Sequence, residues 1–206
     1  MKVLLINGSP HEKGCTYTAL SLIAGELNAS GIETEILNVG TKPVGGCIGC
    51  GGCAADKGCV FGGVVNEAIE KAKTADAFVF GTPVHYASAS GNMTSFMDRL
   101  AYAGGKYLAY KPAAICASAR RAGTTTTLDQ LVKYPEFFHM PLVSGSYWPM
   151  VHGSKPEQVL EDEEGCAVMR ELGRNMAWLL KCIELGKANG ITHPENPRRP
   201  MTNFIR

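Results

Sequence analysis

Short apolar segments alternate with longer segments of helical periodicity along this chain of 206 residues. Apolar runs of about four to eight residues are typical of strands that are buried on both faces, as in a parallel sheet. The pattern predicts five such strands along the chain. They are Lys2–Asn7, Glu33–Asn38, Ala77–Gly81, Ala113–Ala117 and Pro141–Ser144.

Helical segments separate these strands. In the first, Leu20, Ile23, Ala24 and Leu27 recur at the spacing of one helix face, and Gly31 follows as a left-handed cap. Further helical patterns carry apolar faces at 65–72, 93–100 and 128–133. Ser154–Glu157 has the form of a capping box with proline at the first helical position, so it predicts the start of a long helical region that ends at Gly190.

Strands that alternate with helices imply right-handed crossovers and a parallel sheet covered on both faces. We therefore expect an α/β fold, a flavodoxin-like three-layer sandwich with a five-stranded parallel sheet of order 2-1-3-4-5. Residues 1–206 are expected to form one domain, with a cysteine-rich loop at 45–60 and a C-terminal helical extension with a tail at 154–206. The proline-containing tail from Thr192 to Arg206 is expected to be extended and to lie on a neighbouring surface.

Charge and composition exclude several classes of partner. Lys and Arg number 20 against 19 for Asp and Glu, so no strong field attracts nucleic acid or an acidic membrane. No segment approaches the roughly 18 consecutive apolar residues that span a bilayer, and the N-terminal apolar run is too short for a signal peptide. These features favour a cytoplasmic protein, in which the eight cysteines are thiols or metal ligands rather than disulfides.

The loop after the first strand has the features of an anion site. A helix N-terminus offers unpaired N–H groups and positive potential, and hydroxyl groups add donors. Neither the lysine-containing loop of nucleoside triphosphate sites nor the glycine fingerprint of dinucleotide sites is present, so a single phosphate monoester such as that of FMN fits best. The alternative is an ordinary turn between strand and helix. The candidate residues are Ser9, Pro10, Gly14, Cys15, Thr16 and Tyr17.

Two further loops are expected at the same edge of the sheet. In the one after the third strand, backbone N–H groups could meet the polar edge of an isoalloxazine while a proline and a tyrosine pack beside it; the alternative is a helix cap with an incidental aromatic residue. In the one after the fourth strand, two arginines could favour the anionic reduced flavin, or be surface charge. The candidates are Thr82, Pro83, Val84, His85, Tyr86, Ser118, Arg120, Arg121 and Gly123.

These motifs together resemble the NADPH-dependent FMN reductase family. The resemblance is carried by Gly8–Pro10 with Gly14 and Thr16, by Thr82–Tyr86, and by Ser90–Met93 with Phe96–Arg99. It implies a flavodoxin-like fold, bound FMN, NAD(P)H as co-substrate and a homodimer or homotetramer whose interface completes the flavin site. Family members commonly have Asn where this chain has Cys15, which weakens one phosphate donor. Flavin N5 carries the chemistry, so a general-acid role for His85 is possible but not required.

A second chemical motif lies between the second strand and the second helix. Cys47, Cys50, Cys53 and Cys59 have the spacing C-x2-C-x2-C-x5-C in a glycine-rich segment. This triplet spacing is the one by which bacterial ferredoxins bind a [4Fe–4S] cluster, although Val60 stands where ferredoxins often have proline. The motif resembles the iron–sulfur flavoprotein branch of the same family. Zinc and free thiols are the alternatives.

Three functions therefore compete. The first is an FMN-dependent oxidoreductase that passes electrons from NAD(P)H through FMN to a quinone, flavin or protein acceptor. The second is an iron–sulfur flavoprotein electron carrier that takes electrons from ferredoxin through a [4Fe–4S] cluster. The third is a flavin-binding sensor without turnover. Among the remaining cysteines, Cys116, Cys166 and Cys182 are expected to be small buried hydrophobic residues.

Overall fold

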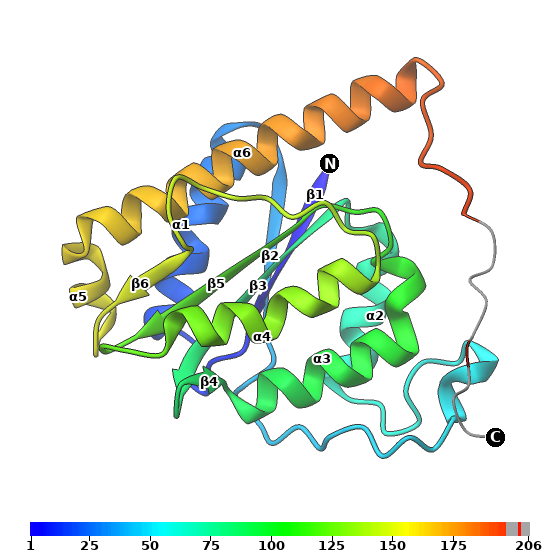
Figure 1. Ribbon diagram of the computed structural model, residues 1–206, viewed down its shortest axis with the longest axis horizontal. Helices are drawn as coiled ribbons and strands as arrows, with labels where there is room; N and C mark the ends of the chain where they lie inside the picture. The colour runs from blue at the N-terminus through cyan, green and yellow to red at the C-terminus, as the bar shows by residue number, and fades with distance from the viewer. Residues whose placement is uncertain (197–201, 203–206) are drawn as a thin grey trace.

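The computed structural model describes residues 1–196 and 202. Five parallel strands form a central sheet in the order β2-β1-β3-β5-β6, and a two-residue strand, β4, pairs antiparallel with β3. Counted without β4, this is the expected order 2-1-3-4-5, so the flavodoxin-like fold is confirmed (Figure 1). The strands are β1 (Lys2–Asn7), β2 (Glu33–Asn38), β3 (Ala77–His85), β4 (Ser88–Ala89), β5 (Ala113–Ala119) and β6 (Met150–His152).

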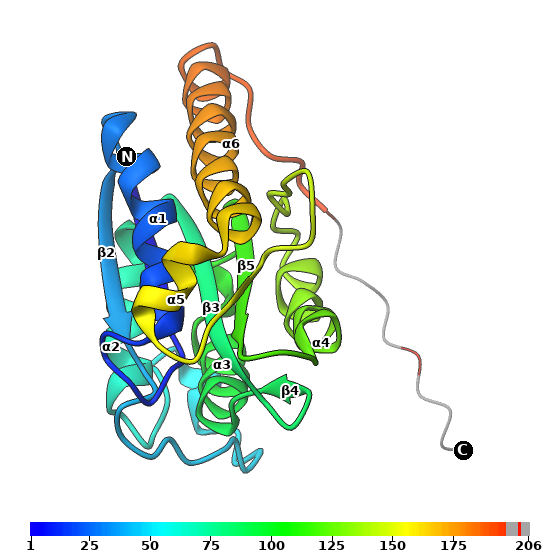
Figure 2. The same ribbon diagram turned by 90° about the vertical axis from the view of Figure 1, so that its left-hand side faces the viewer.

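Helices cover both faces of this sheet, as Figure 2 shows for α1, α5 and α6 on one side and α4 on the other. The α-helices are α1 (Cys15–Ala29), α2 (Val64–Thr74), α3 (Gly91–Gly104), α4 (Thr124–Phe137), α5 (Pro156–Glu161) and α6 (Glu163–Ala188). Short 3₁₀ turns, η1 and η2, occupy Gly52–Ala55 and Gly105–Tyr107.

Strand β1 shows how the sheet divides the core into two clusters. Val3 and Leu5 pack with α1 and α6, whereas Leu4 and Ile6 pack with α2, α3 and α4. Successive side chains of a strand point to opposite faces, so an uninterrupted apolar run serves both layers at once. This explains why β1 has no polar alternation.

The prediction of a fifth strand at Pro141–Ser144 was wrong. Leu142 makes a single parallel bridge with Ala113, and the chain then turns away from the sheet, where the Glu171 carboxylate accepts bonds from Ser146. The fifth parallel strand is β6, which pairs with the carboxyl-terminal half of β5. A run of three strand residues is too short to be recognised by its apolar pattern.

The capping box at the start of the C-terminal helices was also placed one residue early. Lys155, in extended conformation before Pro156, is the N-cap of α5, because a residue before proline is kept out of the helical region. The long helical region is divided at Asp162, whose carboxylate accepts a bond from the Gly165 N–H and caps α6. The helical region ends close to the predicted position, since α6 stops at Ala188 and Gly190 follows with a left-handed φ of +80°.

The described part of the C-terminal tail packs on its own chain. The His193 ring stacks on Tyr110 with a centroid distance of 4.3 Å, and the Asn196 amide donates to the Tyr110 hydroxyl. The rest of the predicted tail, 197–201 and 203–206, lies outside the described residues. Among the described residues, no helix is both long and apolar enough to cross a bilayer.

Glycine makes the close packing behind the first loop possible. A Cβ on Gly40, just after β2, would lie 2.3 Å from the carbonyl oxygen of Ser9, whereas a Cβ on Gly25 in α1 would meet nothing within 4 Å. The contact at Gly40 is with backbone, which cannot rotate away as a side chain can. The turn after β1 therefore lies directly against the turn after β2.

We expect Gly40→Ala to lower the free energy of unfolding by about 1–3 kcal/mol, because the added methyl displaces the Ser9 backbone. The matched control, Gly25→Ala, should raise it by up to about 1 kcal/mol through helix propensity. Urea unfolding followed by circular dichroism measures both. Equal stability of Gly40→Ala and the parent would contradict this packing argument.

Candidate functional site

The first loop is held in place by the side chain of Asn7, the fully buried last residue of β1. The Asn7 amide donates to the Glu12 carbonyl at 3.2 Å and to the Asn38 side chain at 2.8 Å, and its oxygen accepts from the Ser9 N–H at 3.1 Å. Sequence reasoning did not select Asn7. The sequence signal that could have identified Asn7 is a polar residue at the end of an apolar run that is buried on both faces.

The same loop is bonded to the neighbouring strand and to the start of α3. The Gly8 N–H donates to the Gly81 carbonyl at 2.8 Å, and the Ser90 hydroxyl donates to the Gly8 carbonyl at 2.8 Å. A Cβ on Gly8 would lie 2.8 Å from the Met93 sulfur, so this position requires glycine. The first and second predicted loops are thus in direct contact.

Helix α1 begins at this loop without a side-chain cap. Its N-cap is Gly14, and none of its first N–H groups is bonded by a capping side chain. Helix α4 also begins at an uncapped glycine, Gly123, whereas the Ser90 hydroxyl caps α3 by accepting from the Met93 N–H. Uncapped first-turn N–H groups and the helix dipole together favour an anion at the start of α1.

The hydroxyl groups expected to hold the phosphate already have protein partners. The Ser9 hydroxyl accepts from the His11 N–H at 3.1 Å, and the Thr16 hydroxyl bonds to the Ser118 hydroxyl at 2.8 Å. The second bond joins the first turn of α1 to the end of β5. Pro10 is exposed in the loop after β1, and Tyr17 lines a hollow between α1 and β2.

Cys15 is the first residue of α1. Its sulfur contacts the Gly153 carbonyl at 3.4 Å, and burial raises the pKa of the thiol above its ordinary value. The group is therefore a neutral thiol near neutral pH and adds no negative charge beside the anion site.

The second loop is largely strand. Strand β3 continues through His85, beyond the predicted end at Gly81, because it pairs with β4 in a hairpin. Tyr86 and Ala87 form the tip with φ of +50° and +59°, which is the left-handed pair that a two-residue turn between antiparallel strands requires. Neither is glycine, so this tip is strained, and the Tyr86 ring is fully exposed.

The residues before the tip differ in what they offer to a ligand. Thr82 is fully buried, where its hydroxyl accepts from the Ser90 N–H and donates to the Pro83 carbonyl. Pro83 and Val84 are half-buried, and His85 is exposed. Thr82 thus joins the loop to α3, whereas Pro83–His85 leave surface at the edge of the sheet.

The third loop meets this hairpin. A Cβ on Gly123 would lie 2.7 Å from the Ala87 Cα, and the Thr126 hydroxyl donates to the Ala87 carbonyl at 2.7 Å. Arg120 and Arg121 are exposed, and neither guanidinium pairs with a carboxylate anywhere in residues 1–196 and 202. All three predicted loops therefore converge, with two unpaired positive charges beside them.

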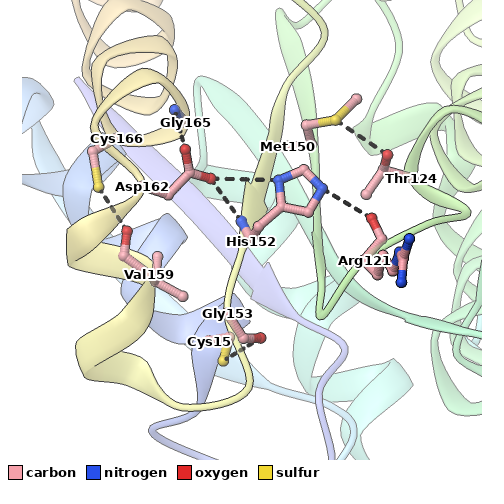
Figure 3. Close-up of polar contacts among 10 residues, drawn as sticks. All are labelled: Cys15, Arg121, Thr124, Met150, His152, Gly153, Val159, Asp162, Gly165 and Cys166. Atoms are coloured by element: carbon pink, nitrogen blue, oxygen red, sulfur yellow. Dashed lines mark hydrogen bonds and ion pairs between the residues drawn. The ribbon is translucent and has the colours of Figure 1, made fainter.

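Strand β6 adds residues that sequence reasoning did not select. Figure 3 shows the His152 ring between Asp162 and the third loop. One ring nitrogen lies 3.0 Å from the Arg121 carbonyl oxygen, the other lies 3.5 Å from the Asp162 carboxylate, and the same carboxylate accepts from the His152 N–H. His152 therefore fixes the backbone that carries Arg121. No local sequence pattern identifies His152, because its partner Arg121 is distant in the chain.

The four motif cysteines line one hollow of about 250 Å³ beside α3, together with Phe61 and Arg99. Within the described residues, no three His, Cys, Asp or Glu side chains are close enough to hold a single metal ion. A cube of four irons takes its thiolates from four separate corners, so four cysteines around one hollow are the ligand set that it requires.

Asn66 of α2 holds the fourth cysteine in position. Its side-chain oxygen accepts from the Cys59 N–H at 2.8 Å, and its amide donates to the Cys59 carbonyl at 3.0 Å. Gly49, Gly51 and Gly58 adopt left-handed conformations that let the loop wrap closely. Asn66 was not selected from sequence either, because an asparagine in a helical pattern carries no distinctive signal.

The cysteines outside this motif are partly as expected. Cys116 and Cys166 are buried, as predicted, but Cys182 on α6 is exposed, so that prediction was wrong. Helix α6 buries one apolar face, so a small residue on the opposite face, such as Cys182, can be exposed without any loss of core packing. Cys182 is thus an exposed thiol on α6, and it does not line the hollow of the four motif cysteines.

Comparison with known proteins identifies relatives. A family model described as NADPH-dependent FMN reductase matches residues 1–155. An iron–sulfur flavoprotein of Methanocaldococcus jannaschii is 30% identical over 193 residues, which are 89% of this chain and 100% of the relative.

Solved structures share the fold at low identity. RosB with bound 8-demethyl-8-formylriboflavin-5′-phosphate has a TM-score of 0.71 and 13% identity, covering 100% of this chain and 93% of that one. An NAD(P)H:quinone oxidoreductase from Methanothermobacter marburgensis has a TM-score of 0.64 and 16% identity, covering 85% and 96%. With the family match and the full-length relative, the chain belongs to the NADPH-dependent FMN reductase family and resembles its iron–sulfur flavoprotein branch.

Proposed function

We propose that this member of an oxidoreductase family binds FMN at the three convergent loops and a [4Fe–4S] cluster at the four motif cysteines, and that it exchanges electrons with a carrier such as ferredoxin. The observation that carries the proposal is that Cys47, Cys50, Cys53 and Cys59 line one hollow. The relative named iron–sulfur flavoprotein, which aligns over its whole length, supports it.

The loop residues fit an FMN phosphate and ring. The uncapped start of α1 supplies N–H donors for the phosphate, and Ser9, Thr16 and Ser118 hold those donors in place through their own bonds. Pro83 to Tyr86 offer surface beside the ring, and Arg120 and Arg121 offer positive charge. When bound, FMN would supply the change between two-electron and one-electron transfer.

The cysteine-lined hollow and the three convergent loops are connected by α3. The Asn92 side chain, in the first turn of this helix, accepts from the Val44 N–H and donates to the Gly40 and Lys42 carbonyls. Arg99 lies seven residues further along, about 10 Å by helix rise, and contacts Cys59. One rigid helix therefore positions both sites relative to each other. When bound, the cluster would supply single electrons.

A second candidate donor is NAD(P)H, with a quinone, flavin or protein as acceptor. The fully exposed Tyr86 ring at the tip of the β3–β4 hairpin favours it, because a planar ligand has an open approach there. The family description and the name of the NAD(P)H:quinone oxidoreductase of the same fold are consistent with it. In this arrangement, donor and acceptor would use the same open face in turn.

We also propose a homodimer or homotetramer. Trp178 and Leu185 on α6 are large apolar residues with 68% and 67% of their surface exposed, and such residues are typical of subunit contacts.

The eight cysteines are all unpaired, which fits a reducing compartment and hence the cytoplasm.

FMN should bind much more tightly than riboflavin, because only FMN carries the phosphate that the start of α1 would hold. Loss of charge-assisted hydrogen bonds worth about 1.5–3 kcal/mol each predicts a difference of about 100-fold or more. Titration calorimetry on the flavin-free chain measures both constants. Equal affinities would show that the phosphate site is misplaced.

Anaerobic reconstitution with iron and sulfide should give about four irons per chain in the parent protein. Cys50→Ser should lower iron content by at least half and leave FMN binding unchanged, because Cys50 lines the hollow and is not part of the three convergent loops. Cys182→Ser is the control, since that exposed cysteine on α6 lies outside the motif. Loss of iron in both variants, or in neither, would contradict the assignment of a cluster to the four motif cysteines.

The two donors are separated by stopped-flow reduction of the reconstituted protein under anaerobic conditions. If electrons enter through the cluster, reduced ferredoxin should bleach the flavin in the parent but at least about tenfold more slowly in Cys50→Ser. NADH and NADPH should then reduce both proteins slowly. Fast reduction by either nicotinamide, unaffected by Cys50→Ser, would favour the second candidate, and no reduction by any donor would favour a sensor.

A further inference from the structure

Arg99 of α3 is a buried arginine outside the three convergent loops, with 6% of its surface exposed. Its guanidinium makes three hydrogen bonds, all to the segment that carries the cysteines. Nε donates to the Cys59 sulfur at 3.2 Å, Nη1 to the Gly45 carbonyl at 3.3 Å and Nη2 to the Gly62 carbonyl at 2.9 Å. One side chain therefore holds both ends of the segment 45–62 and one of its sulfurs.

The positive charge of Arg99 is not balanced by a carboxylate. No Asp or Glu oxygen lies within 4.0 Å of the guanidinium among residues 1–196 and 202, and the carboxylate of its neighbour Asp98 accepts from the Tyr134 hydroxyl instead. A buried charge is costly unless an opposite charge or several hydrogen bonds compensate it. Three hydrogen bonds compensate the charge of Arg99, and cysteines that bound metal as thiolates would add opposite charge beside it.

We propose that Arg99 is a positioning residue that closes the cysteine segment 45–62 by holding its two ends together. Through its charge, Arg99 also raises the reduction potential of the cluster; this inference rests on the proposed function. Uptake of one electron from a carrier such as ferredoxin makes the cluster with its four thiolates one unit more negative. A fixed buried cation stabilises the more negative form and thus favours reduction.

The geometry separates the two roles of this side chain. Arginine presents a rigid fork that reaches Gly45, Cys59 and Gly62 at once, whereas lysine has a single charged nitrogen on a flexible stem. Lysine at position 99 would keep the charge and lose the fork. Glutamine would lose the charge as well. A role confined to packing would not distinguish these two variants by potential.

The electrostatic role is tested by redox titration of the reconstituted protein, with the reduced cluster followed by electron paramagnetic resonance. Arg99→Gln should shift the reduction equilibrium against the reduced form by about tenfold, which is about 59 mV for one electron. Arg99→Lys should shift it less. Lys106→Gln is the control, because Lys106 pairs with Asp56 of the same segment but is more than half exposed, so water screens its charge.

The closing role is tested on the cluster-free chain by hydrogen exchange and mass spectrometry. Both Arg99 variants should exchange the amides of 45–62 at least about tenfold faster than the parent. Peptides from α1 serve as an internal reference and should not change. This measurement needs neither iron nor turnover, and Arg99→Lys keeps it informative if Arg99→Gln does not fold.

The possible outcomes are distinct. Equal potentials in the parent and Arg99→Gln would overturn the electrostatic role, and so would an equal shift in Arg99→Gln and Lys106→Gln. Unchanged exchange at 45–62 in both Arg99 variants would overturn the closing role. A parent protein that assembles no cluster would defeat the proposed function and the electrostatic role together, while the exchange experiment would still decide whether Arg99 closes the segment.

Discussion

The close contact between the turn after β1 and its neighbours is the constraint on which the arrangement of the three loops depends. Gly8 bonds to Gly81 and has no room for a side chain beside Met93, while Gly40 presses on Ser9 from the other side. Parallel strands end at the same edge, so backbone from three strands meets there. Because these contacts are between backbones, the start of α1 is fixed before any ligand binds, and its N–H groups need no reorganisation to meet an anion.

The second constraint is the attachment of the cysteine segment to α3. This segment has little regular structure and few buried apolar residues, so it cannot fold by burial alone. Polar contacts hold it instead: Asn92 at its entry, Asn66 at Cys59, and Arg99 at both ends. A segment held from outside can place four sulfurs around a hollow while its glycines follow the shape that the sulfurs require. The sheet thus serves as a rigid frame for two chemically different sites.

The predictions that succeeded rest on local patterns. Lys2–Asn7 and Glu33–Asn38 coincide with β1 and β2, and the Gly31 cap is left-handed. The family resemblance and the flavodoxin-like fold are confirmed. The misplaced fifth strand shows where local patterns fail: Pro141–Ser144 has strand composition but leaves the sheet after one bridge, whereas β6 has three residues and no pattern. Pairing with β5 decides which segment becomes the strand, and pairing is a long-range property.

The amino-acid sequence by itself determined the alternation of strands and helices, the glycine-rich loop before α1 and the spacing of four cysteines, because each depends on residues close together in the chain. Only the tertiary structure decided that Asn7, Asn66, Arg99 and His152 support the candidate sites. Their partners lie 5 to 54 residues away, and a polar residue in a helix or at a strand end has no local signature of what it will contact. Hydrogen bonds between distant segments form only when the sheet brings those segments together.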